Sequence, residues 1–140
     1  MAAASTDCRW AWATAAGISV AALALSNPSP ADFEAFAGER LVELASKELC
    51  APGGLPLVAQ LVISNCPQLV ASQRQLLGQL AWAGSRRYNA GLFSLYTTEL
   101  GGQTLLPGLT VPRYQALTLA GAGHLVVLQS SQKESPLQQR

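Results

Sequence analysis

The sequence predicts an α+β protein in which an N-terminal transmembrane helix is followed by about three helices packed on a three-stranded antiparallel sheet. Three observations support this class. Residues 10–31 carry no charge, apolar residues then recur at three- and four-residue steps up to about residue 83, and aromatic and β-favouring residues dominate after Gly84. Helices gathered on one face of an antiparallel sheet bury both kinds of apolar pattern.

The uncharged run is long enough to cross a bilayer, since a spanning helix needs about 20 apolar residues. We expect residues 10–26 to form a signal anchor, with residues 1–9 as a short cytoplasmic tail in which Arg9 marks the inner side. Two alternatives stay open. The small-x-small pattern of residues 24–26 is typical of a cleavable signal peptide, and the run also has the composition of a buried core helix.

The rest of the chain is expected on the far side of the membrane, in the periplasm or thylakoid lumen. It consists of an α+β domain over residues 27–129 and a polar flexible tail over residues 130–140, and its length suits one domain. The chain is 49% hydrophobic and 12% charged, which is too apolar for disorder. Its net charge of +1 creates no field to collect nucleic acid, so we expect no such partner.

The three cysteines are divided by the expected membrane span. Cys8 lies on one side, whereas Cys50 and Cys66 lie on the other, and an even number of exported cysteines suggests a disulfide. Two unpaired buried thiols are the alternative. A metal site is disfavoured because these cysteines lack Cys-x-x-Cys spacing and His124 is the only histidine. We therefore expect no metal and no cofactor.

Helix signals delimit three segments in the first part of the exported domain. Ser29 is the expected N-cap of a helix that starts at Pro30, has Asp32 in a variant capping box, and runs to about residue 49. A short apolar helix over residues 55–63 follows a Pro-Gly-Gly stop. A third helix over residues 67–83 ends at Gly84.

Strand signals follow from residue 92 onward. Residues 92–100 form the first expected strand, and a Gly- and Pro-containing loop leads to the second, over residues 113–120. The sequence Gly-Ala-Gly at residues 121–123 predicts a tight turn, and residues 124–129 return as the third strand.

An ordered set of short motifs runs along nearly the whole chain. Its members are Asn27-Pro28-Ser29 after the apolar run, Phe33, Phe36, Ala37, Leu41, Cys50, Cys66, Arg87, Asn89, Phe93-Ser94-Leu95-Tyr96, Thr98, Leu100, Tyr114 and the hairpin of residues 121–128. In this order they resemble the small membrane-anchored domain-of-unknown-function family common in cyanobacteria. The resemblance implies an anchored exported domain with a Cys50–Cys66 bridge. It implies no mechanism, because that family has no assigned activity.

Catalytic groups are few. A nucleophilic triad would need His124, which starts a strand beside a glycine turn without a nucleophile motif. The carboxylates Glu39, Glu43 and Glu48 fall on the solvent-facing side of their helix, so we expect them to be solvated and not to act as a general acid–base pair. No phosphate-binding glycine loop occurs. We therefore expect no enzyme.

One basic and aromatic cluster is a candidate binding patch. Arg86, Arg87 and Asn89 precede the first predicted strand, while Arg113 and Tyr114 begin the second. If these segments lie together, they suit a phosphate, a lipid headgroup or the carboxylate of a partner. The alternative is that the arginines cap the third helix and pair with the acidic first one.

These expectations combine into a single-pass membrane-anchored protein that acts as a non-catalytic interaction module for a protein partner in the same membrane. A small lipid- or ligand-binding domain with a pocket between helices and sheet is the alternative. A soluble protein secreted after signal cleavage ranks behind both.

Overall fold

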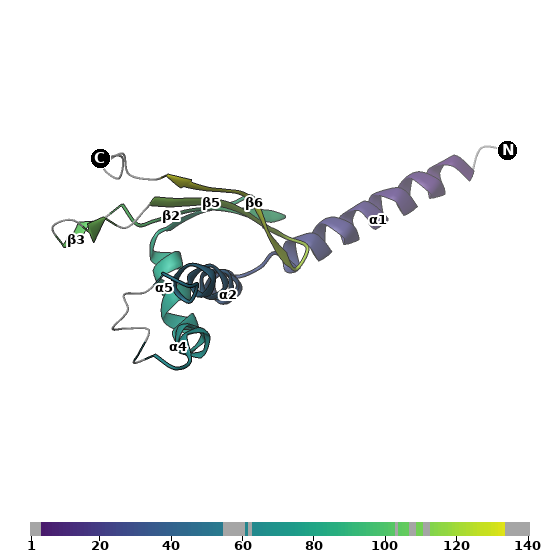
Figure 1. Cartoon of the computed structure of the whole chain (residues 1–140). Coiled ribbons are helices and arrows are strands. Elements are labelled where there is room, and N and C mark those ends of the chain that lie inside the picture. Colours follow the sequence, from purple (N-terminus) through teal and green to yellow (C-terminus); the bar gives the residue numbers. More distant parts are fainter. Residues whose placement is uncertain are drawn as a thin grey trace.

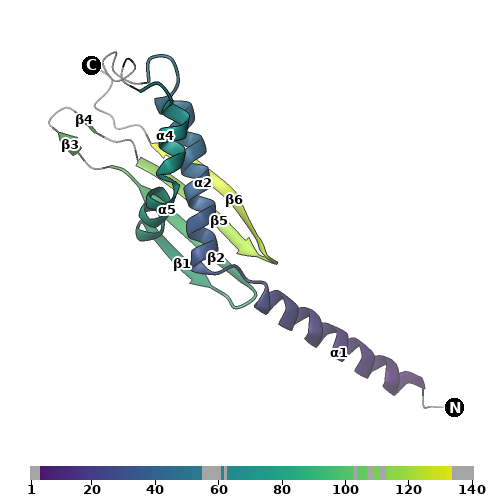
Figure 2. The same cartoon turned by 90° about the horizontal axis from the view of Figure 1, so that it is seen from below.

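A long N-terminal helix projects from a domain in which helices lie on one face of a sheet (Figure 1). The computed structural model describes residues 4–54, 61, 63–102, 104–106, 109–110 and 113–133. The strands and the projecting helix leave their junction in opposite directions, so the end of β6 (His124–Lys133) lies far from the start of that helix (Figures 1 and 2).

The domain does not cover the apolar part of helix α1 (Ala4–Leu25). Its segment Cys8–Leu25 has the length and composition of a membrane-crossing helix, and none of this segment is buried. The interpretation as a buried core helix is therefore wrong. A membrane anchor and a signal sequence both have these properties.

Helix α2 (Pro30–Leu49) begins with the predicted capping box. The Ser29 hydroxyl accepts a hydrogen bond from the Asp32 N–H at 3.3 Å, and the Asp32 carboxylate accepts one from the Ser29 N–H at 2.8 Å. Hydrogen bonds from the Ser29 side chain and then its backbone lower the pKa of Asp32. The folded cap favours the charged carboxylate, so its contribution to stability is lost as the pH falls through this lowered pKa.

The predicted helix over residues 67–83 is two helices. Helix α4 (Cys66–Ser72) ends at Gln73, whose backbone leaves the helical conformation, and α5 (Arg74–Ala83) starts directly afterwards. The Ser72 hydroxyl donates to the Leu69 carbonyl at 2.6 Å, a local bond that competes with helix continuation. The helix predicted over residues 55–63 lies mostly outside the described residues.

Two glycines let α2 and α5 approach backbone to backbone. A Cβ added at Gly38 would lie 2.5 Å from the Arg74 carbonyl oxygen, and one added at Gly78 would collide with the Glu34 carbonyl oxygen. Both glycines are buried. This close contact makes α2 and α5 a single layer against the sheet (Figure 2).

The main sheet has four antiparallel strands in the order β1-β2-β5-β6, so the prediction of three strands is corrected. The additional strand is β1 (Ser85–Asn89), which pairs with β2 (Phe93–Leu100). Its polar sequence lacks a strand pattern, and pairing with β2 makes it extended. Strand β5 (Arg113–Gly121) confirms the second predicted strand.

The remaining strands also differ from the sequence expectation. Strand β6 runs to Lys133, so the first residues of the predicted flexible tail belong to the sheet, and residues 134–140 lie outside the described part. Within the predicted loop, β3 (Thr104–Leu106) and β4 (Leu109–Thr110) pair as a separate two-stranded sheet.

An aromatic stack joins the two layers. The Phe33 and Tyr96 rings lie parallel with centroids 4.0 Å apart, and Trp82 meets the Phe33 ring edge-on at 6.3 Å. Tyr96 is wholly buried, and its hydroxyl has no hydrogen-bond partner among the described residues. Burial raises the pKa of Tyr96, and Arg87 partly opposes this effect. The stack fixes α2 over the first half of the sheet.

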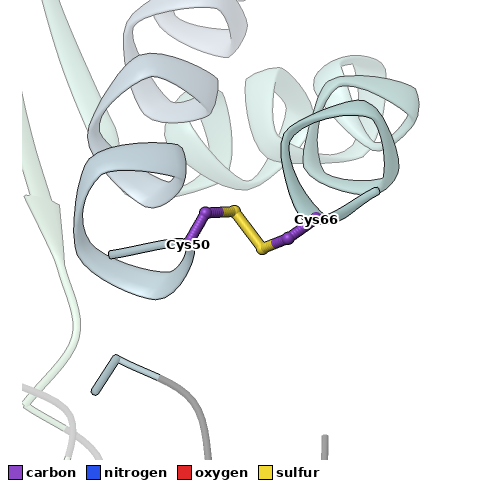
Figure 3. The surroundings of a disulfide bond; sticks show 2 residues. All are labelled: Cys50 and Cys66. Atoms are coloured by element: carbon purple, nitrogen blue, oxygen red, sulfur yellow. A yellow bond between two sulfur atoms is a disulfide. The ribbon is translucent and has the colours of Figure 1, made fainter. Parts of the chain in front are cut away.

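The Cys50–Cys66 disulfide is present and links the end of α2 to the start of α4 (Figure 3). It closes a loop with a sequence separation of 16 residues, and both cysteines are half-buried. Cys8 is exposed and unpaired. The bridge therefore holds the two helices together at the end remote from α1.

We predict that reduction of this bridge, or Cys50→Ser, lowers the free energy of unfolding by about 3 kcal/mol, because the unfolded chain regains the entropy of an open loop of this length. Urea unfolding of the full chain in detergent micelles measures the change. Cys8→Ser is the matched control and should leave the midpoint unchanged. Equal midpoints with and without reductant would contradict the stabilising role.

Candidate functional site

A polar network joins the end of α1 to the sheet, and we call it the polar junction: Asn27, Arg87, Asn89 and Ser94. The Asn27 amide donates to the Asn89 side-chain oxygen at 3.1 Å and to the Gly91 carbonyl at 3.2 Å. The Ser94 hydroxyl donates to the Asn27 side-chain oxygen at 3.1 Å. The Asn27 side-chain amide thus both donates hydrogen bonds to the β1–β2 hairpin and accepts one from it.

Arg87 completes this junction from the inner face of β1. Its guanidinium donates to the Ser94 hydroxyl at 3.0 and 3.2 Å and to the Pro28 carbonyl at 3.4 Å. It also lies over the Tyr96 ring, with Cζ 5.8 Å from the centroid. The polar junction is therefore continuous with the aromatic stack of the core.

The second hairpin also contacts the segment between α1 and α2. The Gly123 N–H, in the β5–β6 turn, donates to the Ser26 carbonyl at 2.6 Å. Residues 26–28 are thus bonded to both hairpins of the sheet, and only four residues separate the two helices. The domain is mounted directly on α1 and not through a free linker.

The five residues of the predicted patch occupy three environments. Arg87 and Asn89 point inward into the polar junction, whereas Arg86 lies on the outer face because successive strand residues alternate. Arg113 is exposed at the end of β5 remote from the polar junction, where it stands opposite Lys133 in the strand register. Tyr114 is half-buried on the inner face. The starts of β1 and β5 are separated by the intervening strand β2 and by the register, which sets Ser85 level with Ala116, three residues along β5 from Arg113. The structure therefore does not gather these side chains.

A groove of about 690 Å³ lies between α2 and the β5–β6 half of the sheet. It exists because the aromatic stack holds α2 over β2, which leaves the inner side of β5 and β6 partly uncovered. Its lining is mainly apolar and includes Phe36, Leu41, Leu44, Tyr114, Thr118 and Val127. Its volume is within the range of ligand pockets, about 300–1,000 Å³.

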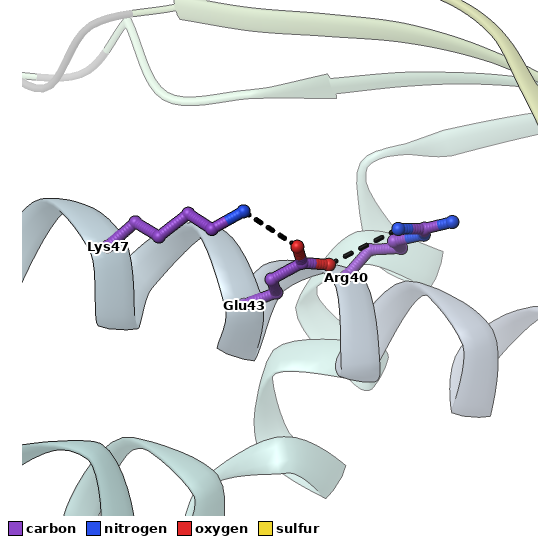
Figure 4. A network of polar contacts seen from close by, with 3 residues as sticks. All are labelled: Arg40, Glu43 and Lys47. Carbon is purple, nitrogen blue, oxygen red and sulfur yellow. Dashed lines mark hydrogen bonds and ion pairs between the residues drawn. The ribbon is translucent and has the colours of Figure 1, made fainter.

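Charged side chains of α2 border this groove. Glu43 accepts from Lys47 at 2.7 Å and from Arg40 at 3.2 Å (Figure 4), and Arg40 lies over the Phe36 ring at 5.5 Å. The hydrogen bond and charge of Lys47, followed by the contact with Arg40, lower the pKa of Glu43. Such exposed pairs contribute little to stability, so their effect is to orient the charges at the groove mouth.

Nothing in the described ranges assembles into a catalytic or metal-binding group. His124 is exposed at the start of β6, beside the β5–β6 turn, and the described residues contain no cluster of three metal-ligating side chains. Glu39 and Glu48 are exposed on α2. The arrangement offers two features for function, the polar junction and the apolar groove.

Sequence reasoning missed the joint role of Asn27, Asn89 and Ser94. Each had been noted in the ordered motifs, but polar residues in three separate segments give no periodic signal. Their proximity requires the β1–β2 register, which places Asn89 opposite Ser94.

Fold and site together define a small α+β domain fixed by a polar junction to an exposed apolar helix. The chain belongs to the family described as a domain of unknown function, DUF4359, whose model matches residues 21–130. The match covers the end of α1, the polar junction, both cysteines and most of the main sheet. No curated protein and no solved structure matches the chain.

We predict that Arg87→Ala destabilises the domain by about 1–3 kcal/mol, because it leaves the buried Ser94 hydroxyl with one partner fewer and removes the contact with Tyr96. Urea unfolding of the full chain in micelles measures this loss. The adjacent Arg86→Ala is the control and should stay within about 0.5 kcal/mol of the parent, since Arg86 is exposed. Equal effects of the two substitutions would show that Arg87 has no special structural role.

Proposed function

We propose that the chain is a non-catalytic, single-pass membrane-anchored module that presents its domain to a protein partner in the same membrane. The observation that carries this proposal is an exposed apolar helix bonded to a folded domain through both hairpins of its sheet. A rigid mount fixes which surfaces of the domain face along the membrane. Such orientation benefits recognition of another membrane component, because less freedom is lost on binding.

The cysteines support an exported domain. Cys50 and Cys66 are bonded on the domain side of α1, while Cys8 is unpaired at the other end of the apolar segment. Structural disulfides persist in oxidising compartments such as the bacterial periplasm. The proposal therefore puts residues 1–9 in the cytoplasm and the domain in the periplasm or thylakoid lumen.

We expect native protein to carry one alkylated cysteine on a full-length chain when thiols are blocked at lysis without reductant, because only Cys8 is free. Intact mass spectrometry gives both the chain length and the number of alkyl groups. Reduction before alkylation is the control and should raise the number to three. A chain starting near Asn27 would replace the anchor with a cleaved signal peptide, and three alkyl groups without reductant would contradict export.

A second candidate is a domain that binds a lipid or another small apolar ligand. The observation in its favour is the groove of about 690 Å³ beside α2, with its apolar lining and charged mouth. A protein segment and an acyl chain would make the same kind of contact with this lining. A covalent crosslink to whatever occupies the groove is therefore needed to distinguish a protein partner from a lipid or other small ligand.

We predict that a photoreactive benzoylphenylalanine replacing Leu44, which lines the groove, crosslinks to one defined membrane protein in native membranes. The same residue replacing Gln79, exposed on α5 outside the groove, is the matched control and should give no such product. Mass spectrometry of the adduct identifies it. A lipid adduct from position 44 would favour the second candidate, and identical patterns from both positions would contradict binding in the groove.

A further inference from the structure

No helix of the described part of the chain covers the outer face of the main sheet (Figure 1). Along the strands, the residues of this face change from apolar to polar. The pairing register divides it into four transverse rows, numbered from the hairpin turns nearest α1. The first row contains Phe93, Gly121 and His124; the second Tyr88, Leu95, Leu119 and Val126; the third Arg86, Thr97, Leu117 and Gln129; and the fourth Glu99, Gln115 and Ser131.

Large apolar side chains are exposed at one end of this face. Phe93, Tyr88 and Val126 expose 44%, 58% and 54% of their surface, and Leu92 is exposed in the β1–β2 turn. The fourth row is polar, and within it Gln115 donates to Glu99 at 3.1 Å. Apart from Leu117, the apolar side chains of the four rows lie in the first two, and exposure to water alone does not explain this grouping.

The apolar end lies level with the end of α1. Asn27 bonds to Gly91 in the first turn, and Ser26 bonds to Gly123 in the second. Both turns are therefore within hydrogen-bond distance of the residues that directly follow the apolar helix. Any membrane crossed by α1 must reach this level of the sheet.

The length of α1 determines how deep in the bilayer the two hairpin turns lie. The uncharged part of the helix runs from Trp10 to Leu25, and at 1.5 Å per residue it spans about 24 Å. The hydrocarbon core of a bilayer is about 30 Å thick. The shortfall of about 6 Å equals the length of two strand residues, which is one row of the sheet.

We propose that the turn-proximal end of the outer sheet face is inserted in the interface of the bilayer that α1 spans. Leu92 and Phe93 contact the edge of the hydrocarbon, and the second row lies among the headgroups, with the amphipathic ring of Tyr88 at the depth such rings prefer. Arg86, one row further out, lies just outside the headgroup layer, from which its long side chain reaches back toward the lipid phosphates that a guanidinium is suited to bind. Glu99 remains in water, about 20 Å beyond the first row.

Lipid, and not a second protein, is the occupant because the surface is continuous with α1. The apolar rows begin where the exposed Leu25 ends, without an intervening charged residue on this face. Asp32, the first acidic residue after α1, lies in the first turn of α2 on the opposite side of the sheet and is held by Ser29. The inference rests on the proposed function in one respect, namely that α1 spans a membrane.

Depth-dependent fluorescence quenching tests the inference. The full chain carries Cys8→Ser, an intact disulfide and one added cysteine labelled with the environment-sensitive dye NBD, in vesicles of phosphatidylcholine and phosphatidylglycerol. Leu92→Cys, in the β1–β2 turn, and Val126→Cys, on β6, probe the apolar end at two separate places. Ser131→Cys, in the fourth row of the same face, is the matched control, and Ala16→Cys probes the middle of α1.

We expect lipids with a nitroxide near the headgroup to quench NBD at positions 92 and 126 at least about threefold more than at position 131. Quenching at position 16 by lipids with a nitroxide deep in the acyl chain, without headgroup quenching at positions 92 and 126, would overturn the inference and leave the anchor intact. Absence of quenching at position 16 by this acyl-chain nitroxide would overturn the anchor itself. Equal quenching at positions 92, 126 and 131 would overturn the ordered insertion by showing a sheet that lies flat on the membrane.

Discussion

The hydrogen bonds of Asn27 with the β1–β2 hairpin are the constraint on which the arrangement depends. Asn27 follows α1 by two residues and precedes the cap of α2, so its two contacts set the direction of both helices relative to the sheet. Arg87 extends the same network to Pro28 and to the face of Tyr96. An amide that donates and accepts at once has little freedom to reorient, which is why a segment of four residues suffices as a rigid mount.

The position of α2 then explains which surfaces are open. Phe33 stacks on Tyr96, and α5 is held against α2 by the close approach at Gly38 and Gly78, so the helical layer is centred on the first strands of the sheet. The inner side of β5 and β6 is left to form the apolar groove. The disulfide secures the far end of the same layer, since it joins the last turn of α2 to α4.

Local rules account well for the helix ends and poorly for two other features. The capping box of Ser29 and Asp32 was predictable because its partners are three residues apart, and the central strands were predictable from their aromatic and β-branched residues. The strand Ser85–Asn89 was not, because its extended form comes from bonds to β2 and not from its own side chains. The break at Gln73 likewise has no glycine or proline to mark it.

The sequence by itself determined the apolar helix and the outline of an α+β domain, since each depends on composition or on residues close in the chain. It suggested the Cys50–Cys66 bond without excluding unpaired thiols. Tertiary structure decided what Arg86 and Arg87 do. The two are adjacent and chemically identical, yet one faces outward beside an apolar surface and the other is bonded to Ser94 in the polar junction. Their roles follow from strand alternation and from the register with β2, which are properties of the folded sheet and not of either residue.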